Sequence, residues 1–122
     1  MIKLKNKDIS SNEFVLACQK MSAAPLPIKA AYNVKKMLDA LQIAKKKIGK
    51  EYEETIYAKY VIKEEGKPDS MPEDNEDFQK ENTVFGDNEV VIDRDLLDIE
   101  SMGDIKLTAR DLSALEPILS VS

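Results

Sequence analysis

The sequence contains no histidine, no tryptophan and a single cysteine among its 122 residues. Without histidine, the chain lacks the commonest general base and the commonest metal ligand of proteins. The lone cysteine, Cys18, excludes an intramolecular disulfide and a zinc site built from several thiolates. Four scattered glycines do not form a phosphate-binding loop. We therefore expect neither an enzyme nor a cofactor-dependent protein.

Long apolar runs are also missing. No stretch approaches the roughly 18 apolar residues of a membrane span, and the charged segment at residues 1–8 does not resemble a signal peptide. A single thiol without a partner fits a reducing compartment. We expect a protein of a cytoplasm, or of a virus particle assembled in one, with no membrane contact.

Hydrophobic residues make up 43% of the chain and aromatic residues only 6%, so the core should be aliphatic. At this length one domain, residues 1–122, is the simplest expectation. Charged residues make up 34%, above the usual quarter. Such a composition suits a small domain with an extensive polar surface.

Charge is divided unequally along the chain. Residues 1–50 carry 11 lysines and three acids, whereas residues 51–122 carry seven basic and 20 acidic residues. Either the two halves fold against one another and neutralise each other, or one of them meets a charged partner. The densest basic segment, Lys45–Lys47, has no arginine or aromatic residue among its lysines, which disfavours nucleic-acid binding.

The dominant predicted element is a long helix over residues 27–65. Its apolar residues recur at spacings of three and four, namely Val34, Met37, Leu38, Leu41, Ala44, Ile48, Tyr52, Ile56 and Tyr60. Gly49 lies near its middle, and a break there would give a helical hairpin. We favour a continuous helix, because the stripe crosses Gly49 without a change of phase.

A helix of this length is too long for the remaining residues to cover, so part of its stripe should meet another chain. The predicted partner-binding residues lie on or beside this stripe: Val34, Leu41, Lys45, Lys46, Ile48, Tyr52 and Tyr60.

Shorter elements surround the helix. Residues 1–22 read as a strand and a short helix, residues 66–77 as an acidic loop, and residues 78–122 as short helical turns and strands. Thr108 and Asp111 fit a capping box that starts a terminal helix. Ile105–Leu107 repeats the Ile-Lys-Leu of Ile2–Leu4, so both termini and residues 89–93 should form one small sheet of two or three strands. The predicted fold is α+β and mostly helical.

Three segments together resemble a family of short bacteriophage proteins of unassigned function. They are the opening Ile-Lys-Leu-Lys-Asn-Lys-Asp-Ile, the central Leu-Pro-Ile-Lys-Ala-Ala-Tyr at residues 26–32, and the closing Ile-Lys-Leu-Thr-Ala-Arg-Asp-Leu at residues 105–112. The resemblance spans most of the chain. It implies a phage origin and a helical hairpin with a small β element, and it supplies no catalytic residues.

We therefore expect a non-enzymatic phage protein that acts by protein–protein contact, and we favour a role in virion or tail assembly. Its partner would be a second copy of itself or another phage protein. An alternative is an acidic inhibitor of a host enzyme or defence factor, with its carboxylates between Asp69 and Asp98 on one face. A weaker alternative is nucleic-acid binding through the lysines of the long helix. The expected location is the host cytoplasm or the assembled virion.

Overall fold

The structure is a computed structural model that describes residues 1–120, so residues 121 and 122, the end of the predicted 78–122 segment, lie outside the described residues. The chain is a mostly helical α+β protein, as predicted. In chain order the elements are β1 (Ile2–Lys5), α1 (Asn6–Ile9), α2 (Asn12–Ala23), α3 (Ile28–Tyr52), the π-helical η1 (Glu53–Tyr57), α4 (Ala58–Tyr60), α5 (Glu76–Asp87), β2 (Glu89–Ile92), β3 (Leu97–Asp98), the 3₁₀ turn η2 (Ile99–Met102), α6 (Ala109–Leu115), the 3₁₀ turn η3 (Glu116–Ile118) and β4 (Leu119–Ser120).

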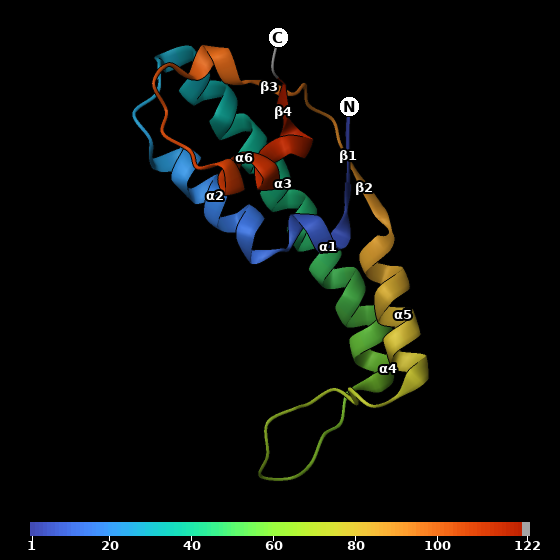
Figure 1. The fold of residues 1–122 in the computed structure, drawn as a ribbon. Coiled ribbons are helices and arrows are strands. Elements are labelled where there is room, and N and C mark those ends of the chain that lie inside the picture. The colour runs from blue at the N-terminus through green and yellow to red at the C-terminus, as the bar shows by residue number, and fades with distance from the viewer. Residues whose placement is uncertain (121–122) are drawn as a thin grey trace.

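One unbroken helical rod, made of α3, η1 and α4, runs from Ile28 to Tyr60 and organises the molecule (Figure 1). The predicted continuity across Gly49 is confirmed, although the rod ends five residues before the predicted boundary. At 1.5 Å per residue it is about 50 Å long. The Thr55 hydroxyl donates to the Glu51 carbonyl at 2.6 Å, a bond that accompanies the wider turns of η1.

The rod joins two regions that differ in thickness (Figure 1). The body comprises residues 1–48 and 88–120, where β1, α1, α2, α6 and the short strands surround the first part of α3. The arm comprises residues 49–87, in which α5 runs back along the end of the rod as a helical hairpin. A loop over residues 61–75 joins the two helices of the arm and projects beyond them.

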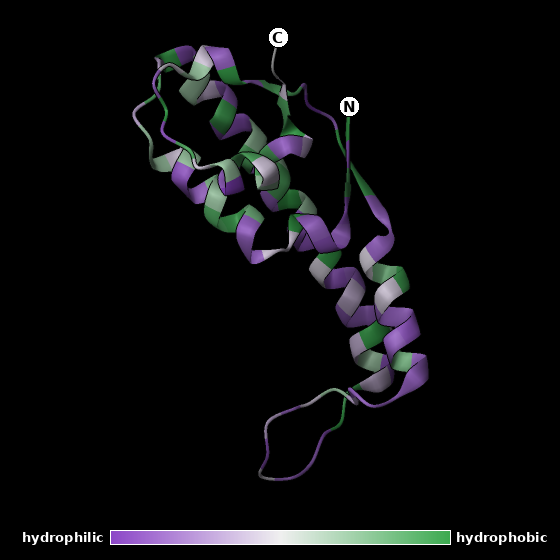
Figure 2. Cartoon of the chain, in the orientation of Figure 1, coloured by the Kyte–Doolittle hydropathy of each residue, from purple (hydrophilic) through white to green (hydrophobic). Residues whose placement is uncertain are grey.

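The core lies in the body, where α2, β2 and η2 pack on α3 and residues of α6 and β1 join the same cluster. Leu41, Val34 and Met37 on α3 are buried, and Met21 of α2 and Leu115 of α6 belong to the same cluster. Figure 2 shows apolar residues gathered where these helices meet, while α5 displays a mostly hydrophilic surface. The three- and four-residue spacing read from the sequence therefore marks the core face of the rod.

Two separate two-stranded sheets border the body. Strand β1 pairs antiparallel with β2, with Ile2 opposite Ile92 and Leu4 opposite Val90. This pairing of the amino-terminal strand with residues 89–93 was predicted. Strand β3 pairs in parallel with β4, so the described carboxyl-terminal strand lies in a different sheet.

The predicted strand Ile105–Leu107, and its place beside β1, are wrong. This segment is an irregular connection, with Ile105 and Leu107 half-buried against the core. Helix α6 packs on α2, where Lys20 Nζ lies 2.9 Å from Asp111 Oδ2, and this contact draws the preceding segment away from β1. The space beside β1 is filled by η3 instead.

The predicted capping box of the terminal helix is confirmed. The Thr108 hydroxyl accepts from the Asp111 amide, and the Asp111 carboxylate accepts from the Thr108 amide. Lys20 and these bonds hold the pKa of Asp111 below its ordinary value. The cap therefore sets both the start of α6 and its docking on α2.

Candidate protein-binding surface

The structure places three predicted partner-binding residues inside the core. Val34 and Leu41 are each 3% exposed and Ile48 is 7% exposed, so none of them is available to a partner. The expectation that the apolar stripe stays partly uncovered is wrong, because α1, α2, β2 and η2 all pack against α3. The rod is long, but its apolar face is satisfied from within the chain.

The two predicted tyrosines hold the arm together. Tyr52 lies edge-on to Phe85 with 5.2 Å between ring centroids, and its hydroxyl donates to Asn82 Oδ1 at 3.0 Å. Tyr60 lies edge-on to Phe78 at 5.5 Å. These rings bridge the rod and α5, so both tyrosines serve the hairpin.

The two predicted lysines differ from each other. Lys46 is exposed and, within residues 1–120, makes no ion pair. Lys45 is half-buried near Cys18, where burial raises the pKa of the thiol to about 11 despite the opposing charge of Lys45. Cys18 therefore stays protonated at neutral pH and serves as a small core residue.

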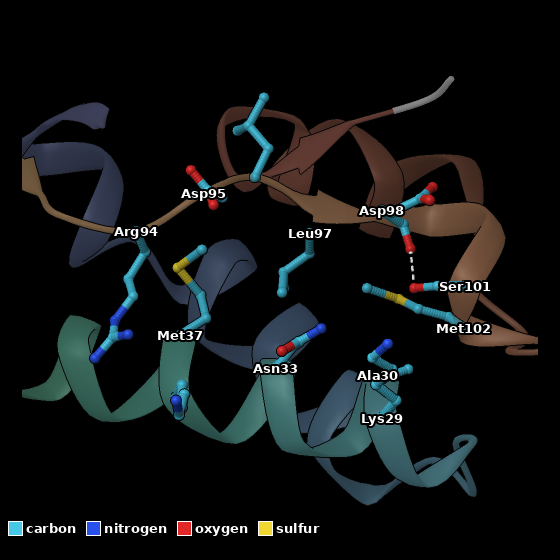
Figure 3. A pocket seen from close by; sticks show the side chains of 12 residues that line it. Lys29, Ala30, Asn33, Met37, Arg94, Asp95, Leu97, Asp98, Ser101 and Met102 are labelled. Atoms are coloured by element: carbon cyan, nitrogen blue, oxygen red, sulfur yellow. Dashed lines mark hydrogen bonds between the residues drawn. The ribbon is translucent and has the colours of Figure 1, made fainter.

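A pocket of about 510 Å³ opens where the start of α3 faces the segment between β2 and η2 (Figure 3). Lys29, Asn33 and Lys36 follow one another at helical spacings of four and three, so they share one face of α3. Arg94 approaches from the opposite segment and points toward α3. Met37, Leu97 and Met102 are buried and also line this space. We call this site the cationic pocket.

The cations of the pocket are not neutralised. Among the described residues neither Lys29 nor Arg94 makes an ion pair, and Lys36 instead lies 4.6 Å from the centre of the Tyr32 ring. The carboxylate of Asp98 accepts from the Glu100 amide at 3.0 Å and caps η2. Figure 3 shows Asp95 and Asp98 turned away from α3, on the far side of their segment. The apolar floor is thus bordered by three cationic side chains without ion pairs and by two acidic residues, Asp95 and Asp98, whose carboxylates face away from α3.

Three large apolar side chains close to the pocket's cations in sequence are exposed at the surface. Ile28 is 89% exposed, Tyr32 56% and Leu96 47%. Leu96 lines the pocket, Ile28 directly precedes Lys29, and the Tyr32 ring contacts Lys36. Apolar groups beside unpaired cations form a surface suited to a partner that offers both apolar and acidic groups.

The sequence patterns did not predict the cationic pocket. The spacing of Lys29, Asn33 and Lys36 is a signal that they share a helix face, yet such a face is usually only solvated. Arg94 lies in a segment rich in acids, and no local pattern links it to the start of the long helix. The chain turns that bring it there are decided by the pairing of β1 with β2.

The other acidic residues do not form the single face that an inhibitor would need. Glu81 pairs with Lys59 at 2.7 Å and Asp87 with Lys7 at 2.9 Å. The acids of the 61–75 loop lie at the far end of the arm, whereas Asp95 and Asp98 border the cationic pocket in the body (Figure 1). The basic and acidic halves of the chain neutralise each other only in part. The ion pairs Lys7–Asp87 and Lys20–Asp111 join the two halves. Within residues 1–120, however, no ion pair is made by Lys45, Lys46 or Lys47.

Residues 1–120 hold no group of three or more acidic or cysteine side chains placed to bind a metal ion. No described helix combines the length and the apolar character that crossing a bilayer requires. Comparison of the chain with protein-family models, with curated proteins and with solved structures finds no match. The geometry of the described residues therefore carries the functional reasoning that follows.

Proposed function

We propose that this chain is a non-enzymatic phage protein that acts by protein–protein contact in virion or tail assembly, and that the cationic pocket receives an acidic segment of its partner. The observation that carries the proposal is the set of three cations, Lys29, Lys36 and Arg94, that line an apolar floor without ion pairs. The phage setting rests on the resemblance of the opening, central and closing segments to phage proteins.

The chemistry of the pocket favours a short acidic peptide over a nucleic acid. One or two carboxylates would find charge-assisted hydrogen bonds from the lysines and the arginine, while an apolar neighbour would cover Leu97 and Met37. A nucleic-acid backbone carries one phosphate per nucleotide and would extend beyond these three cations over a chain of net charge −5, whereas one or two carboxylates fit within the pocket. The partner should therefore carry a small number of acids next to an apolar side chain.

A nuclear magnetic resonance titration tests this pocket directly. The isotope-labelled chain is titrated with acetyl-Leu-Glu-Asp-Leu-amide and, separately, with acetyl-Leu-Gln-Asn-Leu-amide. We expect the acidic peptide alone to shift the amide signals of Asn33, Lys36 and residues 94–97. Equal shifts from both peptides, or a stronger response to a short single-stranded oligonucleotide, would contradict the proposal.

A pocket variant that combines Lys29→Gln, Lys36→Gln and Arg94→Gln should bind the acidic peptide about tenfold more weakly or worse, because each charge-assisted bond is lost. The same variant should fail to co-sediment with virions or tails that retain the wild-type chain.

The matched control combines Lys46→Gln, Lys47→Gln and Lys50→Gln. It removes the same total charge, in this case wholly from α3, and it leaves the pocket intact. It breaks only the exposed Lys50–Glu54 contact at 4.0 Å, so it should bind like the wild type. If the control loses binding as strongly as the pocket variant, net charge and not the pocket is responsible.

A further inference from the structure

The loop at the far end of the arm carries the complementary chemistry. Residues 61–77, which are this loop and the first two residues of α5, contain seven acidic and two basic residues, and we call them the hairpin tip. Met71 and Pro72 are half-buried and directly precede the exposed Glu73 and Asp74. The carboxylates of Glu73 and Asp74 have no hydrogen-bonding or ionic partner in the part of the chain that the structure describes. The tip thus joins apolar side chains to two free carboxylates.

Backbone hydrogen bonds hold this part of the tip in one shape. The Glu73 amide donates to the Met71 carbonyl and the Asn75 amide to the Pro72 carbonyl, each at 2.9 Å. The Gln79 side chain donates to the Glu73 carbonyl at 2.6 Å, and Ile62 and Ser70 form a β-bridge below. An ordered turn loses less conformational entropy on binding than a free loop would.

The tip and the cationic pocket lie at opposite ends of the molecule (Figure 1). Lys29 stands in the first turn of the rod, and the loop begins where the rod ends. The rod separates them by roughly 48 Å, at 1.5 Å per residue. A chain therefore cannot place its own tip in its own pocket.

We infer that the hairpin tip of one copy, through Glu73 and Asp74, occupies the cationic pocket of a second copy, so that the chain assembles head to tail. The inference rests on the proposed function, and it names a second copy of this chain as the acidic partner. Because the two surfaces differ, the contact is heterologous and leaves a free pocket and a free tip on every dimer. Repetition then gives a ring or an open filament.

Neutralising each surface separately provides the test. The pocket variant defined above loses the receiving surface, and a tip variant with Glu73→Gln and Asp74→Asn loses the inserted one. Sedimentation velocity in low salt should show oligomers of the wild-type chain that dissociate in about 1 M salt, where the Debye length is about 3 Å. Each variant alone should be monomeric.

An equimolar mixture of the two variants is the decisive sample. The intact tip of the pocket variant can enter the intact pocket of the tip variant. The resulting dimer has only an altered pocket and an altered tip left, so it cannot bind a further copy. We therefore expect dimers and nothing larger. A mixture that stays monomeric, or variants that still form oligomers alone, would overturn the inference.

Two controls separate this contact from general charge effects. The Lys46, Lys47 and Lys50 control described above should assemble like the wild type, and so should a variant with Glu51→Gln and Glu53→Gln, which removes two acids outside the tip. A wild-type chain that stays monomeric in low salt while its pocket still binds the acidic peptide overturns head-to-tail assembly, yet leaves the proposed function standing with another protein as the partner.

Discussion

The body and the arm share one helix but are stabilised in different ways. In the body, α3 is enclosed by a continuous cluster of buried aliphatic and methionine side chains. In the arm only Ile56 and Phe78 are buried, and neither belongs to that cluster. The arm relies on two edge-on ring pairs, the Tyr52–Asn82 hydrogen bond and the Lys59–Glu81 ion pair. Exposed polar contacts of this kind contribute little each, so we expect the arm to open more readily than the body.

This contrast explains where the two proposed binding surfaces lie. The cationic pocket needs groups from α3 and from the segment after β2 held at fixed positions, and the well-packed body supplies that rigidity. The hairpin tip needs distance from its own pocket, and a two-helix arm supplies length with few buried residues. Four predictions test the contrast, beginning with the largest effect.

Leu41→Ala should lower the free energy of unfolding of the chain by about 3 kcal/mol, because Leu41 is 3% exposed in the main core and its loss leaves a cavity. Urea unfolding followed by circular dichroism measures the change, and both regions should lose structure together. A loss below about 1 kcal/mol would show that the body is less tightly packed than described.

Phe78→Ala should loosen the arm and leave the body in place. The ring pair with Tyr60 is worth about 1 kcal/mol beyond its buried area. Hydrogen exchange should quicken at amides of α5 and the end of the rod, and stay unchanged in α2 and α6. Tyr60→Phe, which keeps the ring, is the control. Faster exchange throughout the chain would mean that arm and body form one cooperative unit.

Gly49→Ala should stabilise the rod, by up to about 1 kcal/mol, at the boundary between body and arm. An added Cβ at Gly49 meets nothing within 4 Å, so the gain in helix propensity is not offset by a clash. Thermal unfolding should show a raised melting temperature. A lowered one would indicate that the arm needs a flexible point in the rod.

Acid should weaken the ion pairs of both regions. The partners Lys20, Lys59 and Lys7 lower the pKa values of Asp111, Glu81 and Asp87 in the folded chain. Because these folded pKa values lie below the ordinary range near 4, the pairs stabilise the chain above that range and lose their effect as the pH falls through the folded pKa values.

Melting temperatures recorded between about pH 7 and pH 3 should therefore fall toward acid. Glu81→Gln should flatten this dependence for the arm, and Asp111→Asn should flatten it for the body. An unchanged profile in Asp111→Asn would show that the Lys20–Asp111 pair does not couple α6 to α2 in solution.

Local patterns predicted a good part of this fold. The apolar spacing from Val34 to Ile56 identified the buried face of the rod, and the strand predicted within residues 1–22 is β1. Thr108 and Asp111 identified the start of α6, since capping depends on residues three positions apart. The prediction of a strand at Ile105–Leu107 was wrong. Its pattern suits a strand, but the packing of α6 on α2 left it without a partner strand.

The candidate site likewise depends partly on local sequence patterns and partly on contacts between distant residues. Periodicity and composition alone established a long amphipathic helix, an aliphatic core, an excess of lysine before residue 50 and an excess of acid after it. Which side of that helix is covered, and which lysines stay unpaired, depended on contacts between residues far apart in the chain. Only folding could bring Arg94 to the same pocket as Lys29 and hold Glu73 and Asp74 some 50 Å from them. The reason is that helix periodicity acts over a few residues, whereas strand pairing and helix docking join distant ones.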